Sequence, residues 1–272
     1  MVKCLTLNAH SWVESLPLKR LFDIAEHIIE ANYDIICLQE VNQRMDSKVA
    51  KQVGDLCVLS DFPAVHEDNF ALNLVRYLEI RGQHYYWSWA YNHIAYDNYN
   101  EGVALLSKTS FEAQDILVSK KHDEFDYHTR HVLLAKTVID DKPITLASLH
   151  LSWQGKGFET EWHHLEQVLS DYPEPYILMG DFNVPTDSSG YRLICQSSLQ
   201  LQDCHHVART LRGHYTIESE IDGWSGNEEQ LKVDHIFVSQ SINVEASEVL
   251  FDGGLSPIVS DHFGIAVTLS VS

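Results

Sequence analysis

Four short segments share one design, in which an apolar strand ends in side chains that can bind a metal ion or move a proton. They are Leu7-Asn8, Leu38-Gln39-Glu40, Met179-Gly180-Asp181-Phe182-Asn183 and Ser260-Asp261-His262. Because Asn, Asp and Glu after a strand also make turns and cap helices, each stretch alone is weak evidence of function. Rigid strands, however, position the short loops at their ends, where binding residues concentrate. Together, the four stretches predict one polar site built from strand ends.

The rest of the apolar pattern alternates between strand and helix periods. Besides the N-terminal strand that ends at Asn8, strands are predicted at 34–38, 85–91, 102–106, 131–139, 144–151, 176–179, 233–238 and 264–269. Helices are predicted at 18–29, 69–81, 159–169 and 190–197. Because many successive strands lack a helix between them, the order favours two sheets packed face to face with helices outside.

One domain is predicted over residues 1–272. A chain of 272 residues with 44% hydrophobic content can bury a substantial core. The sequence contains no repeat of fixed period and no linker rich in Pro, Gly or Ser that would mark a boundary. No apolar run reaches the roughly 18 residues that a membrane helix requires, and the first residues do not read as an export signal. We therefore expect a cytoplasmic protein without membrane contact.

The charge balance argues against nucleic acid as a partner. The chain carries 39 acidic and 19 basic residues, a net charge of −20. Such a surface repels a polyanion, and no run of Lys and Arg is available to neutralise the phosphates of a duplex. A small phosphorylated substrate fits better, because a bound metal ion can still draw one phosphate into an acidic protein. The sequence does not indicate an oligomeric state.

The cysteines do not form a recognisable site. All five are scattered and none belongs to a CxxC pair, so neither a disulfide framework nor a zinc cluster is indicated. Cys4 and Cys37 lie in apolar, strand-like runs. This position favours small buried side chains over nucleophiles.

The polar strand ends supply hard oxygen ligands suited to magnesium. This ion takes one or two carboxylates, keeps several waters and leaves room for a substrate phosphate. Glu40 is the strongest candidate for the protein ligand. We therefore expect a magnesium site, in which manganese can substitute.

The same segments resemble the signature of the endonuclease/exonuclease/phosphatase superfamily, whose fold DNase I shares. Order and spacing match from Asn8 to His262, and Gly-Asp-Phe-Asn followed some 80 residues later by Ser-Asp-His is a specific combination. The resemblance implies an α/β (α+β) fold, a four-layer αββα sandwich, over essentially the whole chain. It also implies that Glu40 binds the metal, with Asn8 beside it and Asp261 bound directly or through water.

The catalytic roles also come from the resemblance. Asp181 would orient or deprotonate the attacking water, and Asn183 would hold that water or a phosphoryl oxygen. His262 would contact the phosphoryl oxygens and stabilise the charge that develops in the transition state. These roles describe a phosphoesterase that uses a metal-activated water.

Further segments extend the likeness, namely 100–104, 129–131, 148–150 and 233–235. They imply that Glu101 orients His150 and that Asp234 orients His262, each carboxylate fixing a tautomer and raising imidazole basicity. The alternative for His150 is an ordinary strand-end histidine bonded to backbone. Arg130 resembles a clamp on phosphoryl oxygens, with a surface salt bridge as the alternative.

Aromatic residues near the site segments bear on the substrate. The rings of Trp12, Trp153 and Trp224 could stack on sugar faces or on bases, and stacking alone does not distinguish these two. The Tyr- and Trp-rich stretch at 85–91 alternates in a way that favours packing in the core for at least one face.

The opening Leu7-Asn8-Ala9-His10-Ser11-Trp12 and the Trp-rich middle of the chain resemble the maltose 6'-phosphate phosphatase branch of the superfamily. With the acidic composition, this likeness favours a phosphomonoesterase acting on a small phosphorylated sugar. The alternatives are a nuclease or nucleotide phosphodiesterase and, behind these, enzymes acting on sphingomyelin-like lipids or inositol phosphates.

Overall fold

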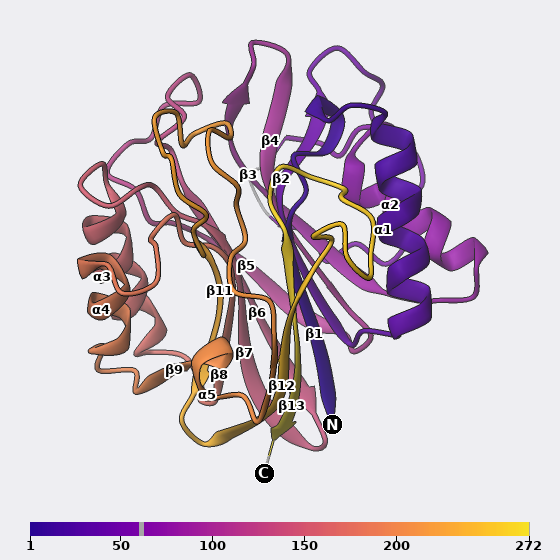
Figure 1. The fold of residues 1–272 in the computed structure, drawn as a ribbon. Helices are drawn as coiled ribbons and strands as arrows, with labels where there is room; N and C mark the ends of the chain where they lie inside the picture. The colour runs from indigo at the N-terminus through magenta and orange to yellow at the C-terminus, as the bar shows by residue number, and fades with distance from the viewer. Residues whose placement is uncertain (60–62, 272) are drawn as a thin grey trace.

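The computed structural model describes residues 1–59 and 63–271, which form two β-sheets packed face to face (Figure 1). The strands of the first sheet lie in the order β10 (Thr210–Arg212), β12 (Ile242–Leu250), β13 (Gly264–Val271), β1 (Val2–Asn8), β2 (Ile35–Arg44), β4 (Tyr99–Ser107) and β3 (Tyr86–Ala95). Those of the second lie in the order β5 (Phe111–Leu117), β6 (His131–Ile139), β7 (Lys142–His150), β8 (Tyr176–Asp181), β11 (Asp234–Ser239) and β9 (Leu201–Asp203).

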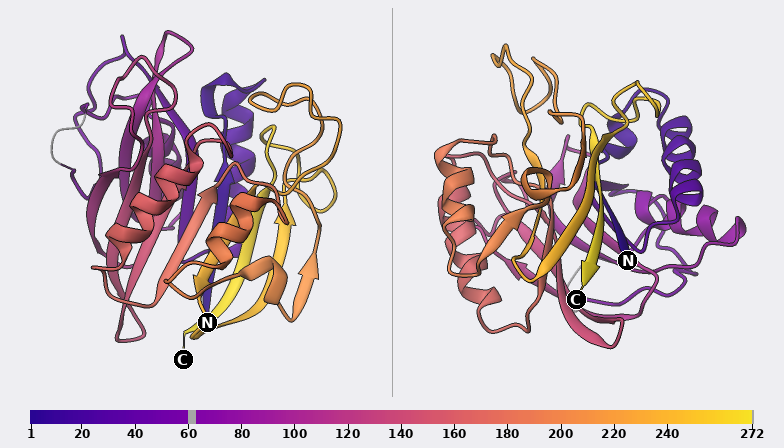
Figure 2. Two further views of the ribbon diagram at one scale, coloured as in Figure 1. Left: turned by 90° about the vertical axis from the view of Figure 1, so that its left-hand side faces the viewer. Right: turned by 60° about the horizontal axis from the view of Figure 1, so that its bottom comes forward.

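Helices cover the outer faces of both sheets. The described helices are the 3-10 turn η1 (Ser11–Val13), α1 (Pro17–Ala31), α2 (Phe70–Ile80), α3 (Phe158–Leu169), α4 (Ser189–Cys195) and the short α5 (Cys204–Val207). In Figure 2, α1 and α2 lie on one side of the molecule and α3 and α4 on the other, with the sheets between them. The predicted four-layer αββα sandwich is therefore confirmed.

The core consists of three apolar layers, one between the sheets and one beneath each pair of helices. Along β1, Cys4 packs between the sheets, whereas Leu5 and Leu7 pack under α1 and α2. On the far side, Trp162 of α3 packs against residues of the second sheet such as Leu178. Because side chains alternate along a strand, strands buried on both faces read as continuous apolar runs. This explains why the central strands are apolar until their last residues.

Strand pairing brings the polar strand ends to one edge of the sandwich. β1 and β2 are parallel, with Asn8 opposite Gln39. β7 and β8 are also parallel, with His150 opposite Asp181, while antiparallel β11 places Asp234 opposite Asp181 on its other side. The residues predicted at the strand ends therefore become neighbours at one end of the molecule.

The predicted helices and strands are all present, although β2 and β3 extend well beyond the predicted 34–38 and 85–91, and four strands of the described residues were not predicted. The missed strands are β5, β9, β10 and β12. In β3, Trp87 and Trp89 are buried in the core with the preceding Tyr85, as the alternation indicated. Cys4 and Cys37 are buried thiols in the core. Within residues 1–59 and 63–271, none of the helices has the length and apolarity needed to cross a membrane.

Candidate active site

The predicted residues surround a pocket of about 550 Å³ at the edge where the strand ends meet. Eight of them line it, namely Glu40, Glu101, Arg130, His150, Trp153, Asp181, Asn183 and His262. A larger hollow of about 890 Å³ lies beside β3 and β5 and is lined by none of them. The chemistry therefore concentrates in the smaller pocket.

Asn8 connects the two central carboxylates. Its amide nitrogen Nδ2 donates to Glu40 Oε1 at 2.9 Å and to Asp181 Oδ2 at 3.2 Å, while its Oδ1 accepts from the backbone N–H of His10 at 3.2 Å. These partners fix the amide with its N–H groups toward the carboxylates, because a carboxylate can only accept and a backbone N–H can only donate. Asn8 thus positions Glu40 and Asp181. Its predicted role as a metal ligand stays a prediction.

Glu40 adopts an unusual backbone conformation. Its φ is +52°, and the pairing of β2 with β4 shifts register between Leu38 and Val41. The hydroxyl of Ser11 donates to the Glu40 carbonyl and so holds this bulge against η1. A non-glycine residue in the left-handed region stores strain that the surrounding structure must maintain, and such residues cluster at functional sites. Here the bulge re-aims the Glu40 side chain into the pocket.

His262 and Asp234 form the predicted pair. His262 Nδ1 lies 2.9 Å from Asp234 Oδ2, and His262 Nε2 lies 3.8 Å from Asp181 Oδ2. Burial opposes a charge on this imidazole, but the negative charges of Asp234 and Asp181 prevail and hold the pKa of His262 well above its ordinary value. The site therefore contains an imidazolium beside a carboxylate, a donor suited to phosphoryl oxygens.

Asp181 and Asn183 occupy the sharp turn after β8. The backbone N–H of Asn183 donates to Asp181 Oδ1 at 2.8 Å, and Asn183 has a φ of +53°. Burial, and then the nearby charge of Asp234, raises the pKa of Asp181 to about 7. A carboxylate with a pKa near neutrality can both accept and release a proton at physiological pH.

The structure corrects the predicted partner of Glu101. Glu101 Oε1 lies 3.4 Å from His93 Nε2, and no hydrogen bond or ion pair joins it to His150 among the described residues. Instead, His150 Nε2 lies 3.5 Å from Asp181 Oδ2. The physical reason is a bulge in β3 between Tyr91 and His93, which places His93 directly opposite Glu101 on β4.

His93 is therefore a pocket residue that the sequence analysis missed. It lines the pocket and is buried, and burial, helped by the charge of Arg130, lowers its pKa to about 3. Burial and the charge of Glu40 raise the pKa of Glu101 to about 8. A neutral imidazole thus faces a carboxyl group that ionises reluctantly. No strand alternation reveals such a residue, because a bulge changes the face on which a strand's side chains lie.

Arg130 is a buried cation without a carboxylate partner. Its side chain is only 2% exposed, and Nε and Nη1 have no hydrogen-bond partner among the described residues. The guanidinium lies 6.0 Å from the ring centroid of Trp153. The alternative of a surface salt bridge is therefore wrong. A buried charge without a partner is costly, so this one indicates a place for an anion.

Of the tryptophans, Trp153 and Trp224 line the pocket, but Trp12 does not. The indole N–H of Trp12 donates to the carbonyl of Asp68 at 2.6 Å, and its ring packs edge-on against Phe70 with centroids 5.1 Å apart. The prediction that Trp12 binds substrate is therefore wrong. The left-handed residues His10 and Ser11 turn the chain after β1 and direct Trp12 toward α2.

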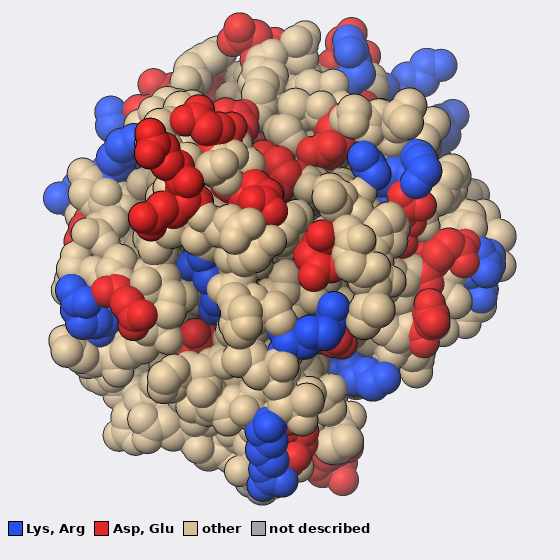
Figure 3. All heavy atoms as spheres, viewed as in Figure 1, with Lys and Arg blue, Asp and Glu red and all other residues tan. Residues whose placement is uncertain are grey.

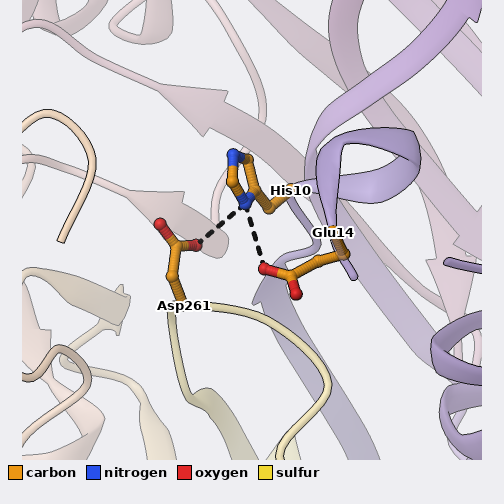
Figure 4. A group of neighbouring side chains, drawn as sticks. All are labelled: His10, Glu14 and Asp261. Carbon is orange, nitrogen blue, oxygen red and sulfur yellow. Dashed lines mark hydrogen bonds and ion pairs between the residues drawn. The ribbon is translucent and has the colours of Figure 1, made fainter. Parts of the chain in front are cut away.

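Asp261 lies at the rim, in a small cluster with His10 and Glu14 (Figure 4). His10 Nδ1 lies 3.0 Å from Glu14 Oε1 and 3.6 Å from Asp261 Oδ1. Although burial opposes protonation, the hydrogen bond that His10 donates to Glu14 and the charges of the surrounding carboxylates raise the pKa of His10 to about 9. The His10 imidazole therefore lies between two carboxylates, those of Glu14 and Asp261. The predicted role of Asp261 as a metal ligand stays a prediction.

The donor set of the pocket fits a hard divalent cation. Burial raises the pKa of Glu40 as well as those of Glu101 and Asp181, and Asp234 Oδ1 is buried without a hydrogen-bond partner in the described part of the chain. Crowded buried carboxylates favour a positive ion among them. Ligand atoms of Asp181 and Asp234 lie within 4.8 Å of each other. The protonated ring of His262 lies beside them, so the two carboxylates are the groups of this cluster that suit a cation.

Comparisons with known proteins identify the family of this chain. A model of the Endonuclease/Exonuclease/phosphatase family matches residues 15–262. An endonuclease/exonuclease/phosphatase family protein from Leptotrichia buccalis is 27% identical, with a TM-score of 0.85 over 99% of this chain and 100% of that one. No curated protein matches the sequence significantly.

More distant structures share the fold. The mannosyl-6-phosphatase Bt3783 of Bacteroides thetaiotaomicron is 18% identical, with a TM-score of 0.66 over 99% of this chain and 100% of that one. The human Nocturnin catalytic domain, solved with bound sulfate, is 16% identical, with a TM-score of 0.68 over 99% and 93% of the two chains. Because the family model spans the segments that form the pocket from Glu40 to His262, the chain belongs to the endonuclease/exonuclease/phosphatase family.

Proposed function

We propose that this protein is a cytoplasmic, magnesium-dependent phosphomonoesterase that releases phosphate from a small phosphorylated sugar such as maltose 6'-phosphate. Members of the family are hydrolases, some of them phosphatases, and they typically use divalent metal ions. One observation carries the proposal. The buried guanidinium of Arg130, whose Nε and Nη1 have no hydrogen-bond partner in the described part of the chain, lies in the same pocket as the buried carboxylates Glu40 and Asp181. This pocket can hold an anion on one side and a cation on the other.

The chain's own residues have separable roles in this proposal. Asp181 takes the proton of the attacking water, because its pKa of about 7 suits a base at neutral pH. Asn183 holds that water or a phosphoryl oxygen through its amide. Arg130 and His150 bind the phosphoryl group from the second sheet. His262, kept protonated by Asp234, donates to the oxygen on which charge develops.

Glu40 would hold the metal ion, with Asn8 fixing the direction of its carboxylate. When bound, magnesium would supply positive charge to the phosphoryl oxygens and lower the pKa of a bound water. Manganese is expected to substitute, because it prefers the same oxygen ligands.

The surroundings of the pocket support a small substrate. Exposed acidic residues gather on the loop between β10 and β11, namely Glu218, Glu220, Asp222, Glu228 and Glu229. Figure 3 shows this acidic patch at the upper left, over the loop drawn in orange in Figure 1. Such a rim repels a polyanionic chain. Trp153 and Trp224 line the same pocket, and aromatic rings can stack on the apolar face of a sugar.

A substrate screen tests the proposal. Phosphate release is measured with magnesium on maltose 6'-phosphate, other sugar phosphates and nucleotides, alongside cleavage of abasic DNA and sphingomyelin. We expect release from sugar phosphates, loss of turnover in EDTA and recovery with magnesium or manganese. Cleavage of DNA or lipid without sugar phosphate hydrolysis would refute the substrate class. Activity that survives full chelation would refute the metal dependence.

A further inference from the structure

Asn183 is held on three sides. Its backbone N–H donates to Asp181, and its side-chain Nδ2 donates to the carbonyl of Leu151 at 2.9 Å. Its Oδ1 accepts from the indole Nε1–H of Trp224 at 3.2 Å. A carbonyl can only accept and an indole N–H can only donate, so these two partners determine which way round the amide stands.

The orientation decides what the amide offers to the pocket. A primary amide has two N–H donors, and Leu151 takes one of them. Because Leu151 accepts from one N–H and Trp224 donates to the oxygen, the donor that remains for a ligand is the second N–H. A donor attracts a phosphoryl oxygen, whereas the oxygen of a flipped amide would repel it. The Trp224 contact therefore selects the useful face of Asn183.

Trp224 comes from a loop tied directly to the site. At its base, the Thr216 hydroxyl accepts from the backbone N–H groups of Val233 and Asp234, and the Thr216 carbonyl accepts from the N–H of Phe263 at 2.7 Å. Thr216 therefore connects the base of the loop to Phe263, which follows His262, and to Asp234, which orients the His262 ring. The loop belongs to the same rigid frame as the catalytic pair.

The tip of the loop is fixed on two further sides. Tyr96 donates from its hydroxyl to Asp222 Oδ2 at 2.7 Å, which connects the loop to the turn between β3 and β4. On the other side, Gly223 has a φ of +75°, and a Cβ added there would lie 2.7 Å from Cζ2 of Trp153. Only glycine allows the backbone to lie this close to the ring. The contacts of Asp222 with Tyr96 and of Gly223 with Trp153 therefore hold the loop where Trp224 reaches Asn183.

We infer that Trp224 is a positioning residue of the active site, which acts by holding the Asn183 amide with an N–H group toward the phosphoryl oxygens. The inference rests on the proposed phosphoester hydrolysis at this pocket. It extends the site to the loop between β10 and β11. The only role predicted for Trp224 from the sequence was stacking of its ring on the substrate.

The decisive variant is Trp224→Phe, which removes the indole N–H and keeps an aromatic ring. We expect kcat to fall about tenfold, the scale of one well-placed hydrogen bond, with KM changed much less. Trp87→Phe is the matched control. Its indole N–H also donates to a carbonyl, that of Val53 at 2.8 Å, but it lies outside the pocket. This control is expected to lower the melting temperature and to leave kcat unchanged.

A double-mutant cycle with Asn183→Ala separates positioning from general damage. In the Asn183→Ala background, Trp224→Phe should cost no further activity, because no amide remains to be oriented. The same loss in both backgrounds, or no loss in either, would overturn the inference.

Hydrogen exchange gives a readout that does not depend on turnover. Among the six indole N–H signals of the protein, that of Trp224 should exchange slowly in the wild type and faster in Asn183→Ala. If the wild type hydrolysed no phosphomonoester, the proposed function would fail, and this measurement alone would decide the inference. Equal exchange in both proteins would contradict it.

Discussion

Asp181 is a buried carboxylate whose environment favours the protonated form. Its raised pKa shows that ionisation in the folded protein is unfavourable relative to water. Asp203 is the opposite case. It is also buried, but it is 3.3 Å from Lys232 Nζ and accepts from the hydroxyl of Tyr191 at 2.9 Å. Although burial opposes its charge, the charge of Lys232 holds the pKa of Asp203 well below its ordinary value. The two residues therefore offer a matched pair for mutation.

We predict that Asp181→Asn lowers kcat by about 10²–10⁴-fold, the usual contribution of a positioned base. The melting temperature should stay the same or rise, because the variant removes an unfavourable buried charge. Asp203→Asn should show the reverse pattern, with kcat largely retained and the unfolding free energy lowered by about 3–5 kcal/mol, since Lys232 loses its partner. Steady-state kinetics and thermal denaturation check both. Equal effects of the two variants on kcat would contradict the role of Asp181.

The sequence predicted the polar pocket residues better than it predicted their pairs. The Asp234–His262 pair was predicted because segments 233–235 and 260–262 resemble the signature of the family, and the structure joins the two residues. The partner of Glu101 was missed, because the bulge in β3 is set by tertiary packing and leaves no pattern in the sequence. Trp12 was misplaced for a similar reason, since the direction of the chain after β1 depends on two left-handed residues.

At the scale of elements, the contact between β7 and β8 determines the geometry of the site. Gly180 has a φ of +155°, and a Cβ added there would lie 2.0 Å from the carbonyl oxygen of Leu149. The two strands end at His150 and Asp181, which are directly opposite each other. Any widening of this pair of strands therefore separates two pocket residues.

We predict that Gly180→Ala lowers the unfolding free energy by about 3 kcal/mol or more and abolishes turnover, because backbone must move to admit the methyl group. Chemical denaturation and kinetics measure the two effects. Gly254→Ala is the control, since an added Cβ there meets only the side chain of Asp252, at 3.3 Å or more. If Gly180→Ala were as stable and active as this control, the close approach of the strands would not constrain the site.

The two longer strands that were not predicted, β5 and β12, share a physical feature. β5 and β12 lie toward the edges of their sheets and expose part of one face, so charged residues interrupt their apolar alternation. The predicted strands include the central ones, which are apolar on both faces. These strands could be predicted because burial on both faces makes their sequences continuously apolar, and not because of their strand propensity.

At the scale of the whole molecule, the pocket couples stability to pH. The folded pKa values of Glu101 and Asp181, about 8 and about 7, exceed their ordinary values of 4.5 and 3.8. At a pH between the ordinary and the folded pKa of each group, the carboxyl group is protonated in the folded protein and ionised in the unfolded chain. The contribution of these two carboxyl groups to the unfolding free energy of the metal-free protein should therefore decrease as pH rises through this range, and it is lost above about pH 8.

Magnesium should reverse this loss. Because the ion needs ionised carboxylates, we predict that it raises the melting temperature more at about pH 8.5 than at about pH 6.5. Each rise compares the protein with and without magnesium at one pH, so the opposite effect of His93, which is protonated in the unfolded chain near pH 6.5 and neutral in the folded protein, is the same on both sides of the comparison. Sodium chloride at equal ionic strength controls for screening of the −20 charge. An equal rise at both pH values would show that the pocket carboxylates do not bind the ion.

β1 lies in the sheet between β2 and β13, so one of its two neighbours is formed by the last residues described, with Val2 opposite Leu269. On the ribosome, β1 therefore lacks this neighbour until the residues of β13 have been made. At about 5–20 residues per second this delay is on the order of tens of seconds. Throughout it, β1 keeps an unpaired edge, and Asn8 stays apart from His262. Until then the newborn chain should expose this edge to chaperones, and the pocket cannot be complete before His262 has been made.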